Sequence, residues 1–200
     1  MAYSCAAIIF DFGGVLTKPG GFSEFSSWCA SKYQRDSSPL YQLIITNWLL
    51  VRAGNIPPEL FWSRGAQYLQ IEPMMFKSEF SQFFAVEPNA IAFVRSLKGR
   101  FLLGLVTNHI KDRFEEIIME YKLTTIFDII LTSYELKIAK PDTRLFDEIL
   151  QRLNLKPNEC IYIDDQTTNI HVAHQYGMHS ILFKSLSQLD YELKQYQPST

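Results

Sequence analysis

The segment at residues 7–16 constrains the fold of this 200-residue chain more than any other. Residues 7–10 are all apolar and do not alternate with polar ones, which is typical of a strand covered on both faces of a sheet. Asp11 follows at once, and Gly13 and Gly14 then interrupt the strand. The Asp11 carboxylate is therefore predicted at the carboxyl edge of a parallel sheet, where open α/β sheets bind their ligands.

From residue 88 onwards, strand and helix patterns alternate. Such alternation is typical of right-handed crossovers between parallel strands. The predicted fold class is α/β, with a three-layer Rossmann-like parallel sheet core. The strands that we expect after the first one span residues 101–106, 127–131, 160–163 and 180–183, and the helices span residues 89–98, 110–121, 142–153 and 167–176.

The stretch of residues 18–87 has no convincing strand and shows several helical patterns separated by Pro and Gly. We therefore predict a Rossmann-like core of residues 1–17 and 88–200 with an inserted all-helical cap domain of residues 18–87. All three tryptophans fall in this insert, where packing in a helical core is favoured over substrate stacking. The helices are expected to begin near Ser23, Ser37, Pro57 and Pro73, and the first three to end near Tyr33, Arg52 and Leu69.

The composition is that of a globular protein with a sizeable core, since 47% of the residues are hydrophobic and 20% are charged. A formal net charge of −2 argues against a nucleic-acid partner, because such proteins carry a basic patch. No apolar run is long enough to span a membrane, and the first residues lack the basic region of a signal peptide. Three cysteines without CxxC spacing indicate reduced thiols and a cytoplasmic location.

Polar residues end two of the later strands. Thr107 and Asn108 follow the strand at residues 101–106, where a hydroxyl and an amide before a helix suit phosphate oxygens. The same pair is also a common helix cap. Lys140 precedes Pro141, which we expect in the first turn of the next helix, so that Lys140 is predicted to point at the sheet edge.

A stronger signal is the pair Asp164 and Asp165, directly after the strand at residues 160–163. Two adjacent carboxylates repel each other at the top of a buried strand unless a cation lies near them. Mg²⁺ prefers one or two carboxylates together with water and substrate phosphate, so the pair favours a magnesium site over a helix cap. Asn169 and Ala173 share one face of the next helix and are expected to pack rather than to contact substrate.

In this order and spacing, the four segments resemble the motifs of the haloacid dehalogenase-like (HAD) hydrolase superfamily. The resemblance covers nearly the whole chain and implies a helical cap between the first and second motifs. It favours a hydrolase of phosphoric monoesters that acts on a small phosphorylated metabolite, such as a sugar phosphate. The matching segments are Asp11 to Leu16, Thr107-Asn108, Lys140-Pro141 and Asp164-Asp165.

The resemblance also implies roles for individual residues. Asp11 would be the nucleophile that forms an aspartyl-phosphate, and Lys140 would pair with it and with the transferring oxygens. Thr107, Asn108 and Lys140 would bind the phosphate. The Mg²⁺ ligands would be Asp11, the backbone carbonyl of Gly13, Asp165 and Asp164.

The chain departs from the family pattern at Gly13, because active phosphatases of the family usually carry a second Asp there as general acid and base. Its loss removes a factor of about 10²–10⁴ for a poor leaving group and less for a good one. The Asp-x-Gly variant is similar to a branch that includes bacterial sugar-1-phosphate phosphatases. His109, Thr17 and Glu24 are candidate substitutes for the proton shuttle, and none of them is favoured.

Two rival functions stay open. A 2-haloacid dehalogenase would use Asp11 on carbon without metal, but the acidic pair and the lack of an aromatic residue at position 13 argue against it. A catalytically impaired HAD-fold protein with a binding or regulatory role is the second, and the intact Asp11, Lys140 and Asp165 argue against it.

The predicted cap carries charges of its own. Arg52, Arg64 and Lys18 are candidates to bind a second anionic group, although solvated surface charge is the favoured interpretation. The sequence does not choose between a monomer and a homodimer, and it leaves the physiological substrate open.

Overall fold

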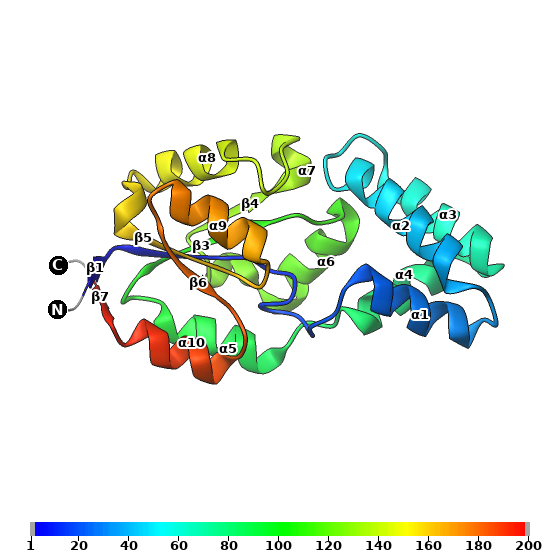
Figure 1. The fold of residues 1–200 in the computed structure, drawn as a ribbon, viewed down its shortest axis with the longest axis horizontal. Helices are drawn as coiled ribbons and strands as arrows, with labels where there is room; N and C mark the ends of the chain where they lie inside the picture. Colours follow the sequence, from blue (N-terminus) through cyan, green and yellow to red (C-terminus); the bar gives the residue numbers. More distant parts are fainter. Residues whose placement is uncertain (1–2, 199–200) are drawn as a thin grey trace.

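The computed structural model describes residues 3–198, and its centre is a five-stranded parallel sheet (Figure 1). The strand order is β4-β3-β2-β5-β6. The predicted α/β class with a Rossmann-like parallel sheet is therefore confirmed. The strands are β2 (Ala7–Phe10), β3 (Leu102–Thr107), β4 (Ile129–Thr132), β5 (Cys160–Asp164) and β6 (His179–Leu182).

Helices cover both faces of this sheet, which explains why residues 7–10 show no alternation. Ile8 and Phe10 belong to the apolar cluster on one face, and Ala7 and Ile9 belong to the cluster on the other. All four are fully buried. The first cluster packs under α5 (Pro88–Leu97), α6 (Lys111–Tyr121) and α10 (Leu186–Leu193), and the second under α8 (Arg144–Leu153) and α9 (Thr167–Gln175).

The strand order of the sheet switches sides between β2 and β5. The chain goes from β2 to β3 and β4 on one side, then crosses to β5 and β6 on the other. The two neighbours stay paired to their ends, because the backbone N–H of Asp11 donates to the carbonyl of Ile163 at 2.8 Å. Asp11 and Asp164 consequently lie side by side at the switch point, where ligands of such sheets bind.

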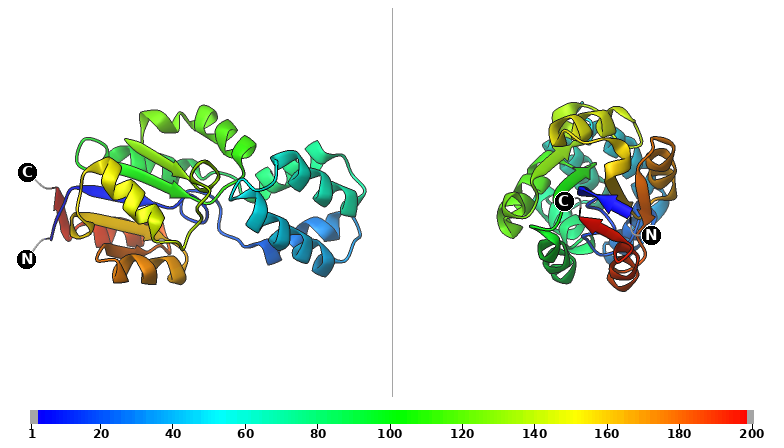
Figure 2. Two further views of the ribbon diagram at one scale, coloured as in Figure 1. Left: turned by 90° about the horizontal axis from the view of Figure 1, so that it is seen from above. Right: turned by 90° about the vertical axis from the view of Figure 1, so that its left-hand side faces the viewer.

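Four helices form a separate helical unit beyond the carboxyl ends of the strands (Figures 1 and 2). They pack around an apolar cluster of their own, in which Trp62 is buried and against which Trp28 and Trp48 pack. The bounds of the domains, residues 18–87 against 1–17 and 88–200, stay a prediction. The helices of the unit are α1 (Phe22–Lys32), α2 (Ser37–Val51), α3 (Pro58–Leu69) and α4 (Pro73–Phe83).

The two connections between the helical unit and the sheet run next to each other. The backbone N–H of Lys18 donates to Ala85 O at 2.8 Å, and the N–H of Glu87 donates to Leu16 O at 2.9 Å. The two chain segments are therefore bonded to each other where they join the helical unit to the sheet.

A second contact joins the helical unit to the start of α6. The Lys77 ammonium lies 2.6 Å from one carboxylate oxygen each of Asp112 and Glu116, and the Trp62 indole N–H donates to Asp112 at 2.9 Å. Burial alone would lower the pKa of Lys77, but the hydrogen bonds and charges of the two carboxylates raise it. This cluster orients α4 against α6.

Two predicted helix starts differ from the observed ones. Helix α1 begins at Phe22 with Gly21 as the cap, rather than at Ser23, because the Glu24 carboxylate accepts the Gly21 N–H at 3.1 Å. Helix α8 begins only at Arg144, so Pro141 does not occupy its first turn, and the Lys140–Pro141 peptide bond is cis.

Both ends of the described chain meet in a short parallel pair, β1 (Tyr3–Cys5) with β7 (Tyr196–Pro198). Residues 196–198 therefore belong to a strand, while 199–200 lie outside the described residues. Sequence patterns also missed α10, α7 (Ser133–Leu136) and the 3₁₀ turns Leu123–Thr125 and Pro157–Glu159.

The three cysteines are free, in line with the predicted reduced thiols, and all three are buried. None of the helices within residues 3–198 combines the length and the apolar character that a bilayer crossing needs.

The helical unit provides a test of stability against pH. Glu79 is buried, and its Oε1 accepts hydrogen bonds from Lys32 Nζ at 2.7 Å and from the Tyr33 hydroxyl at 2.6 Å. Burial would raise the pKa of Glu79, but these bonds and the Lys32 charge lower it below its ordinary value of 4.5. A depressed folded-state pKa contributes stability above the unfolded value, and this stability is lost as pH falls through the folded value.

We predict that Glu79→Gln lowers the free energy of unfolding by about 1 kcal/mol at pH 7, because the charge-assisted hydrogen bonds weaken. The difference from the parent should shrink as pH falls below 4.5. Urea unfolding at several pH values measures both, with Glu59→Gln, at an exposed position of α3, as the control. A difference that persists unchanged at low pH would contradict the prediction.

Candidate active site

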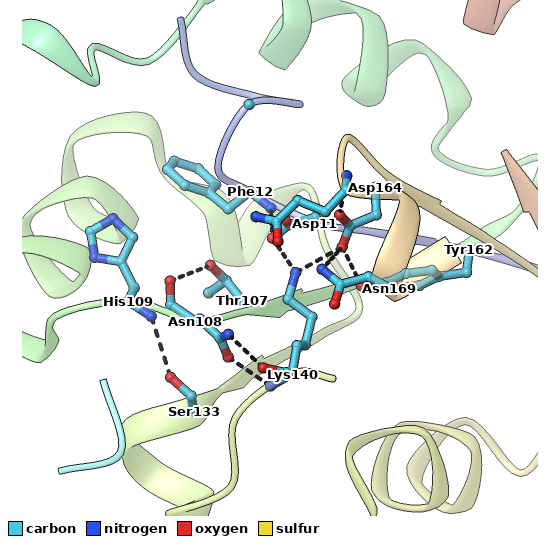
Figure 3. A network of polar contacts seen from close by, with 12 residues as sticks. Asp11, Phe12, Thr107, Asn108, His109, Ser133, Lys140, Tyr162, Asp164 and Asn169 are labelled. Carbon is cyan, nitrogen blue, oxygen red and sulfur yellow. Dashed lines mark hydrogen bonds and ion pairs between the residues drawn. The ribbon is translucent and has the colours of Figure 1, made fainter. Parts of the chain in front are cut away.

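Asp11 is held at the end of β2 with only 4% of its surface exposed. Its Oδ1 accepts the Phe12 backbone N–H at 2.5 Å and lies 2.6 Å from Lys140 Nζ (Figure 3). Among the described residues no donor contacts the second oxygen, Oδ2. One oxygen of this carboxylate is therefore fixed by the protein, and the other is available to a ligand.

Asp164 is the most fully bonded carboxylate of the site and is completely buried. Its Oδ2 accepts from Lys140 Nζ at 3.0 Å, from the Tyr162 hydroxyl at 2.6 Å and from Asn169 Nδ2 at 2.9 Å. Its Oδ1 accepts the Gln166 backbone N–H at 2.8 Å. These four donors make Asp164 the fixed point against which Lys140 is oriented (Figure 3).

Lys140 places a buried positive charge between two carboxylates. Burial alone would lower the pKa of Lys140, but the charges and hydrogen bonds of Asp11 and Asp164 raise it, so the ammonium stays charged. Burial raises the pKa of Asp11 to about 7, against the opposing charge of Lys140 and with the help of Asp164. An added cation would reverse this rise and keep Asp11 ionised.

Asn108 forms hydrogen bonds with both the backbone N–H and the backbone carbonyl of Lys140. Its Oδ1 accepts the Lys140 N–H at 2.9 Å, and its Nδ2 donates to Lys140 O at 3.2 Å. The predicted partner Thr107 is buried at the end of β3, with its hydroxyl 3.4 Å from Asn108 O. The Asn108 amide thus fixes the segment that carries Lys140, a contact that the sequence did not indicate.

Gly14 allows Asp165 to approach the loop after β2. The backbone of Gly14 has φ +71°, and a Cβ atom there would lie 2.1 Å from Asp165 Oδ2. At Gly13, by contrast, a Cβ atom would meet nothing within 4 Å. Only Gly14 therefore needs to be glycine for the Asp165 carboxylate to reach its observed place.

The acidic cluster fits a hard divalent cation. Oxygen atoms of Asp11, Asp164 and Asp165 all lie within 4.8 Å of one another. Lys140 offsets only one of these three negative charges, and no side chain of the described residues donates to the Asp165 carboxylate. An all-oxygen donor set with excess negative charge is the one that Mg²⁺ prefers.

A pocket of about 340 Å³ lies between the sheet edge and the helical unit, and its size is typical of small-ligand sites. Of the predicted site residues, Thr107 and Asp164 do not line it. Those that do are Asp11, Gly13, Asn108, Lys140 and Asp165. The helical unit adds a mostly aromatic wall of Phe22, Trp48, Phe80, Phe84 and Arg52.

The three candidate substitutes for the missing acid are placed differently. Glu24 is exposed and caps α1, and it does not line the pocket. Thr17 lines the pocket, but its hydroxyl accepts the Gly14 N–H at 2.9 Å and donates to Lys18 O. His109 also lines it and accepts the Ile110 N–H at 2.9 Å. Burial lowers the pKa of His109 to about 4, so it is neutral at pH 7.

Two residues contribute to the site without a sequence motif. Tyr162 lies in the predicted strand of residues 160–163, and its hydroxyl reaches Asp164 two residues further along the same face of β5. Trp48 was assigned to the helical core, but it also lines the pocket and contacts the His109 ring at 6.5 Å between centroids. Neither role leaves a local sequence signal, because both depend on tertiary contacts.

Comparison with known proteins defines the class. The sequence profile of the haloacid dehalogenase-like hydrolases matches residues 65–183, which is more than half of the chain. The chain therefore belongs to the haloacid dehalogenase-like hydrolase family, as the sequence motifs indicated.

Two individual relatives share less than 30% of their residues with the chain over the matched segments. Mouse acyl-CoA dehydrogenase family member 10 is 29% identical over 194 residues, which cover 89% of this chain and 18% of that protein. Glyceraldehyde 3-phosphate phosphatase of Pyrococcus furiosus is 28% identical over 106 residues, or 52% of this chain and 44% of the phosphatase. The chain thus spans less than half the length of either relative. Haloacid dehalogenases are among the similar proteins as well.

Solved structures agree on the fold. The HAD family enzyme BT-2542 of Bacteroides thetaiotaomicron, in its magnesium complex, superposes with a TM-score of 0.77 at 18% identity. The match covers 94% of this chain and 98% of that enzyme. At this identity the likeness extends to the fold alone.

The two adjacent glycines give a matched test of the loop after β2. We predict that Gly14→Ala lowers the free energy of unfolding by about 1–3 kcal/mol, because alanine is strained at positive φ and its Cβ displaces Asp165. Gly13→Ala should stay within about 0.5 kcal/mol of the parent. Thermal and urea unfolding of both variants check this, and equal stabilities would refute the assigned role of Gly14.

Proposed function

We propose that this protein is a magnesium-dependent phosphatase that acts on a small phosphorylated metabolite through an aspartyl-phosphate on Asp11. One observation carries the proposal. The Asp11 carboxylate is bonded through one oxygen to Lys140, while its other oxygen is left without a donor beside a pocket of ligand size. Residues 18–87 are proposed as the cap over this pocket.

The proposed chemistry begins with Asp11. Its free oxygen attacks the phosphorus atom, the bond from phosphorus to the leaving oxygen breaks, and an aspartyl-phosphate forms. Water then attacks the phosphorus and releases inorganic phosphate, which regenerates the carboxylate. Lys140, already fixed by Asp164 and Asn108, donates to the phosphoryl oxygens as negative charge develops on them.

Asp11, Asp165, Asp164 and the Gly13 carbonyl are the proposed magnesium ligands. Bound there, the ion would offset charge between the phosphate and the carboxylates. Of these groups, Asp164 already accepts four hydrogen bonds from the protein, so Asp11 and Asp165 have the freer oxygens. Thr107 and Asn108 are proposed to support the phosphate site from the end of β3.

The proton for the leaving group is the weak point of the proposed site. Gly13 has no side chain, and neutral His109 does not hold a transferable proton at neutral pH. The leaving group must therefore depart with little assistance or take its proton from solvent. This favours substrates whose leaving group has a low pKa, such as acyl phosphates or the anomeric oxygen of a sugar 1-phosphate.

The acidic cluster and Lys140 also favour a phosphatase over the two rival functions, a dehalogenase and a catalytically impaired binding protein. A dehalogenase that releases halide from carbon gains nothing from three carboxylates gathered within 4.8 Å. The buried Lys140 between two carboxylates is likewise an arrangement that a purely structural protein has no need to keep. The cytoplasmic location and the choice between monomer and homodimer stay predictions.

The proposal is tested with Asp11→Asn. We predict that the parent hydrolyses some members of a panel of sugar phosphates, acyl phosphates and nucleotides only with Mg²⁺, and that Asp11→Asn lowers this activity more than about 10³-fold. Asp190→Asn, at an exposed position of α10, is the control and should keep the activity. Trapping of beryllofluoride with Mg²⁺ by the parent but not by Asp11→Asn would locate the acceptor.

Other outcomes favour the rivals. Release of chloride from 2-chloropropionate in the presence of EDTA would identify a dehalogenase. A parent protein that neither turns over any phosphate ester nor traps beryllofluoride would be the catalytically impaired member.

Gly13→Asp tests the missing acid directly. A Cβ atom at this position meets nothing within 4 Å, so the first atom of the new side chain has room. We predict that Gly13→Asp raises kcat by about tenfold or more for alkyl phosphates with poor leaving groups and little for acyl phosphates. Gly13→Asn, of equal size but without the acid, is the control. Equal gains for both leaving-group classes would contradict the proton-transfer explanation.

A further inference from the structure

Arg52 brings a positive charge to the wall of the pocket opposite the sheet edge. It follows the last residue of α2 and, within the described residues 3–198, is the one charged residue that the helical unit contributes to the pocket lining. The other charged lining residues, Asp11, Lys140 and Asp165, come from the ends of the sheet strands and the loop before α8. The pocket thus has a second cation that is separate from the Asp11–Lys140 pair.

The Arg52 side chain has no partner among the described residues. Its Nε is buried without a hydrogen bond, and no ion pair involves its guanidinium. Two other cations of the helical unit, the buried Lys77 and the half-buried Arg64, differ in this respect. Lys77 contacts two carboxylates, and Arg64 donates to Asn47 Oδ1.

An unpaired, half-buried guanidinium is unfavourable in free energy. Burial lowers the pKa of Arg52, which remains charged at any physiological pH. A buried donor without an acceptor loses its hydration and gains nothing in return. The planar fork of donors matches a carboxylate or phosphate in a bidentate fashion, so an anionic ligand would satisfy it.

The residues around Arg52 indicate the chemistry of the ligand segment that would join such an anion to the reacting group. Aromatic rings of Phe22, Trp48, Phe80 and Phe84 line the same pocket. These rings offer apolar contact within the pocket and bring no negative charge to it. The wall therefore suits a ligand with a charged group at each end and a less polar middle.

We propose that Arg52 binds a second anionic group, a carboxylate or a phosphate, on a small substrate whose reacting phosphoryl group lies at Asp11 and Lys140. This inference rests on the proposed function for the identity of the first group. It defines the substrate class as phosphorylated metabolites with two anionic ends. Neutral phosphorylated sugars would leave Arg52 unpaired and bind less tightly.

Binding of unreactive phosphonates tests the inference independently of catalysis. The probes are ω-phosphonocarboxylates of increasing chain length and the matching alkylphosphonates, which lack the carboxylate. Isothermal titration with Mg²⁺ present should show about 10- to 100-fold tighter binding for the best phosphonocarboxylate than for its alkyl match. Bisphosphonates of the same lengths distinguish a second phosphate from a carboxylate.

Variants assign the difference to Arg52. Arg52→Gln should remove most of the preference, and Arg52→Lys should restore part of it, because the charge returns without the bidentate geometry. Arg64→Gln, also half-buried in the helical unit but outside the pocket lining, is the matched control and should keep the preference. Thermal unfolding of each variant verifies that it is folded.

Turnover gives a second measure once a substrate is known. The ratio of kcat/KM for two-anion over one-anion phosphates should fall about 10- to 100-fold in Arg52→Gln and stay constant in Arg64→Gln. A preference that survives in folded Arg52→Gln, or a parent without any preference, would overturn the inference. If the parent hydrolyses no phosphate ester but still binds phosphonocarboxylates more tightly than alkylphosphonates, the proposed function is rejected. The anion site at Arg52 then stands without it.

Discussion

The ammonium of Lys140, shared between Asp11 and Asp164, is the interaction on which the rest of the site depends. Two carboxylates at the ends of neighbouring strands would repel each other in a buried setting, and each would tend to take up a proton. The lysine offsets one charge and holds Oδ1 of Asp11, which leaves Oδ2 open. The position of the Asp11 carboxylate therefore depends on how firmly Lys140 is kept in place.

Three separate segments keep it there. Asn108, after β3, fixes the Lys140 backbone: its Oδ1 accepts from the Lys140 N–H and its Nδ2 donates to the Lys140 carbonyl. Asp164, at the end of β5, fixes the ammonium and is itself held by Tyr162 and Asn169. Because β3 and β5 flank β2 on opposite sides, the sheet order brings both supports to the same edge. The strand topology thus has a direct chemical consequence.

The sequence predicted the parts of this arrangement that have local patterns. The unbroken apolar run of β2, the glycines after Asp11 and the acidic pair after β5 are all short-range signals, and they place the edge of the sheet correctly. The strands β1 and β7 were missed because three-residue strands carry almost no periodicity. The start of α8 was misplaced because Pro141 resembles a first-turn proline, although the helix begins later.

Side-chain partnerships were harder to predict than elements. The phosphate contact of Asn108 stays a prediction, and its side-chain amide also bonds the backbone of a residue 32 positions away. No local pattern could indicate this, because the partner is brought close only by the pairing of β3 with β2 and β4. The same holds for Arg52, whose lack of a partner becomes apparent only when every neighbour in the fold is known.

The division of the pocket between two structural units has a mechanical consequence. The sheet edge supplies Asp11, Lys140 and the acidic cluster, whereas the helical unit supplies Arg52 and the aromatic wall. A ligand can therefore contact both Arg52 and the sheet edge only when the helical unit and the sheet are in this arrangement. The paired connections near Leu16 and Glu87 and the contact of Lys77 with α6 hold that arrangement. Without an acid at position 13, such a site lacks one source of catalysis and depends more on binding its substrate tightly. Contacts far from the reacting atom then contribute a larger share of the binding energy that lowers the barrier.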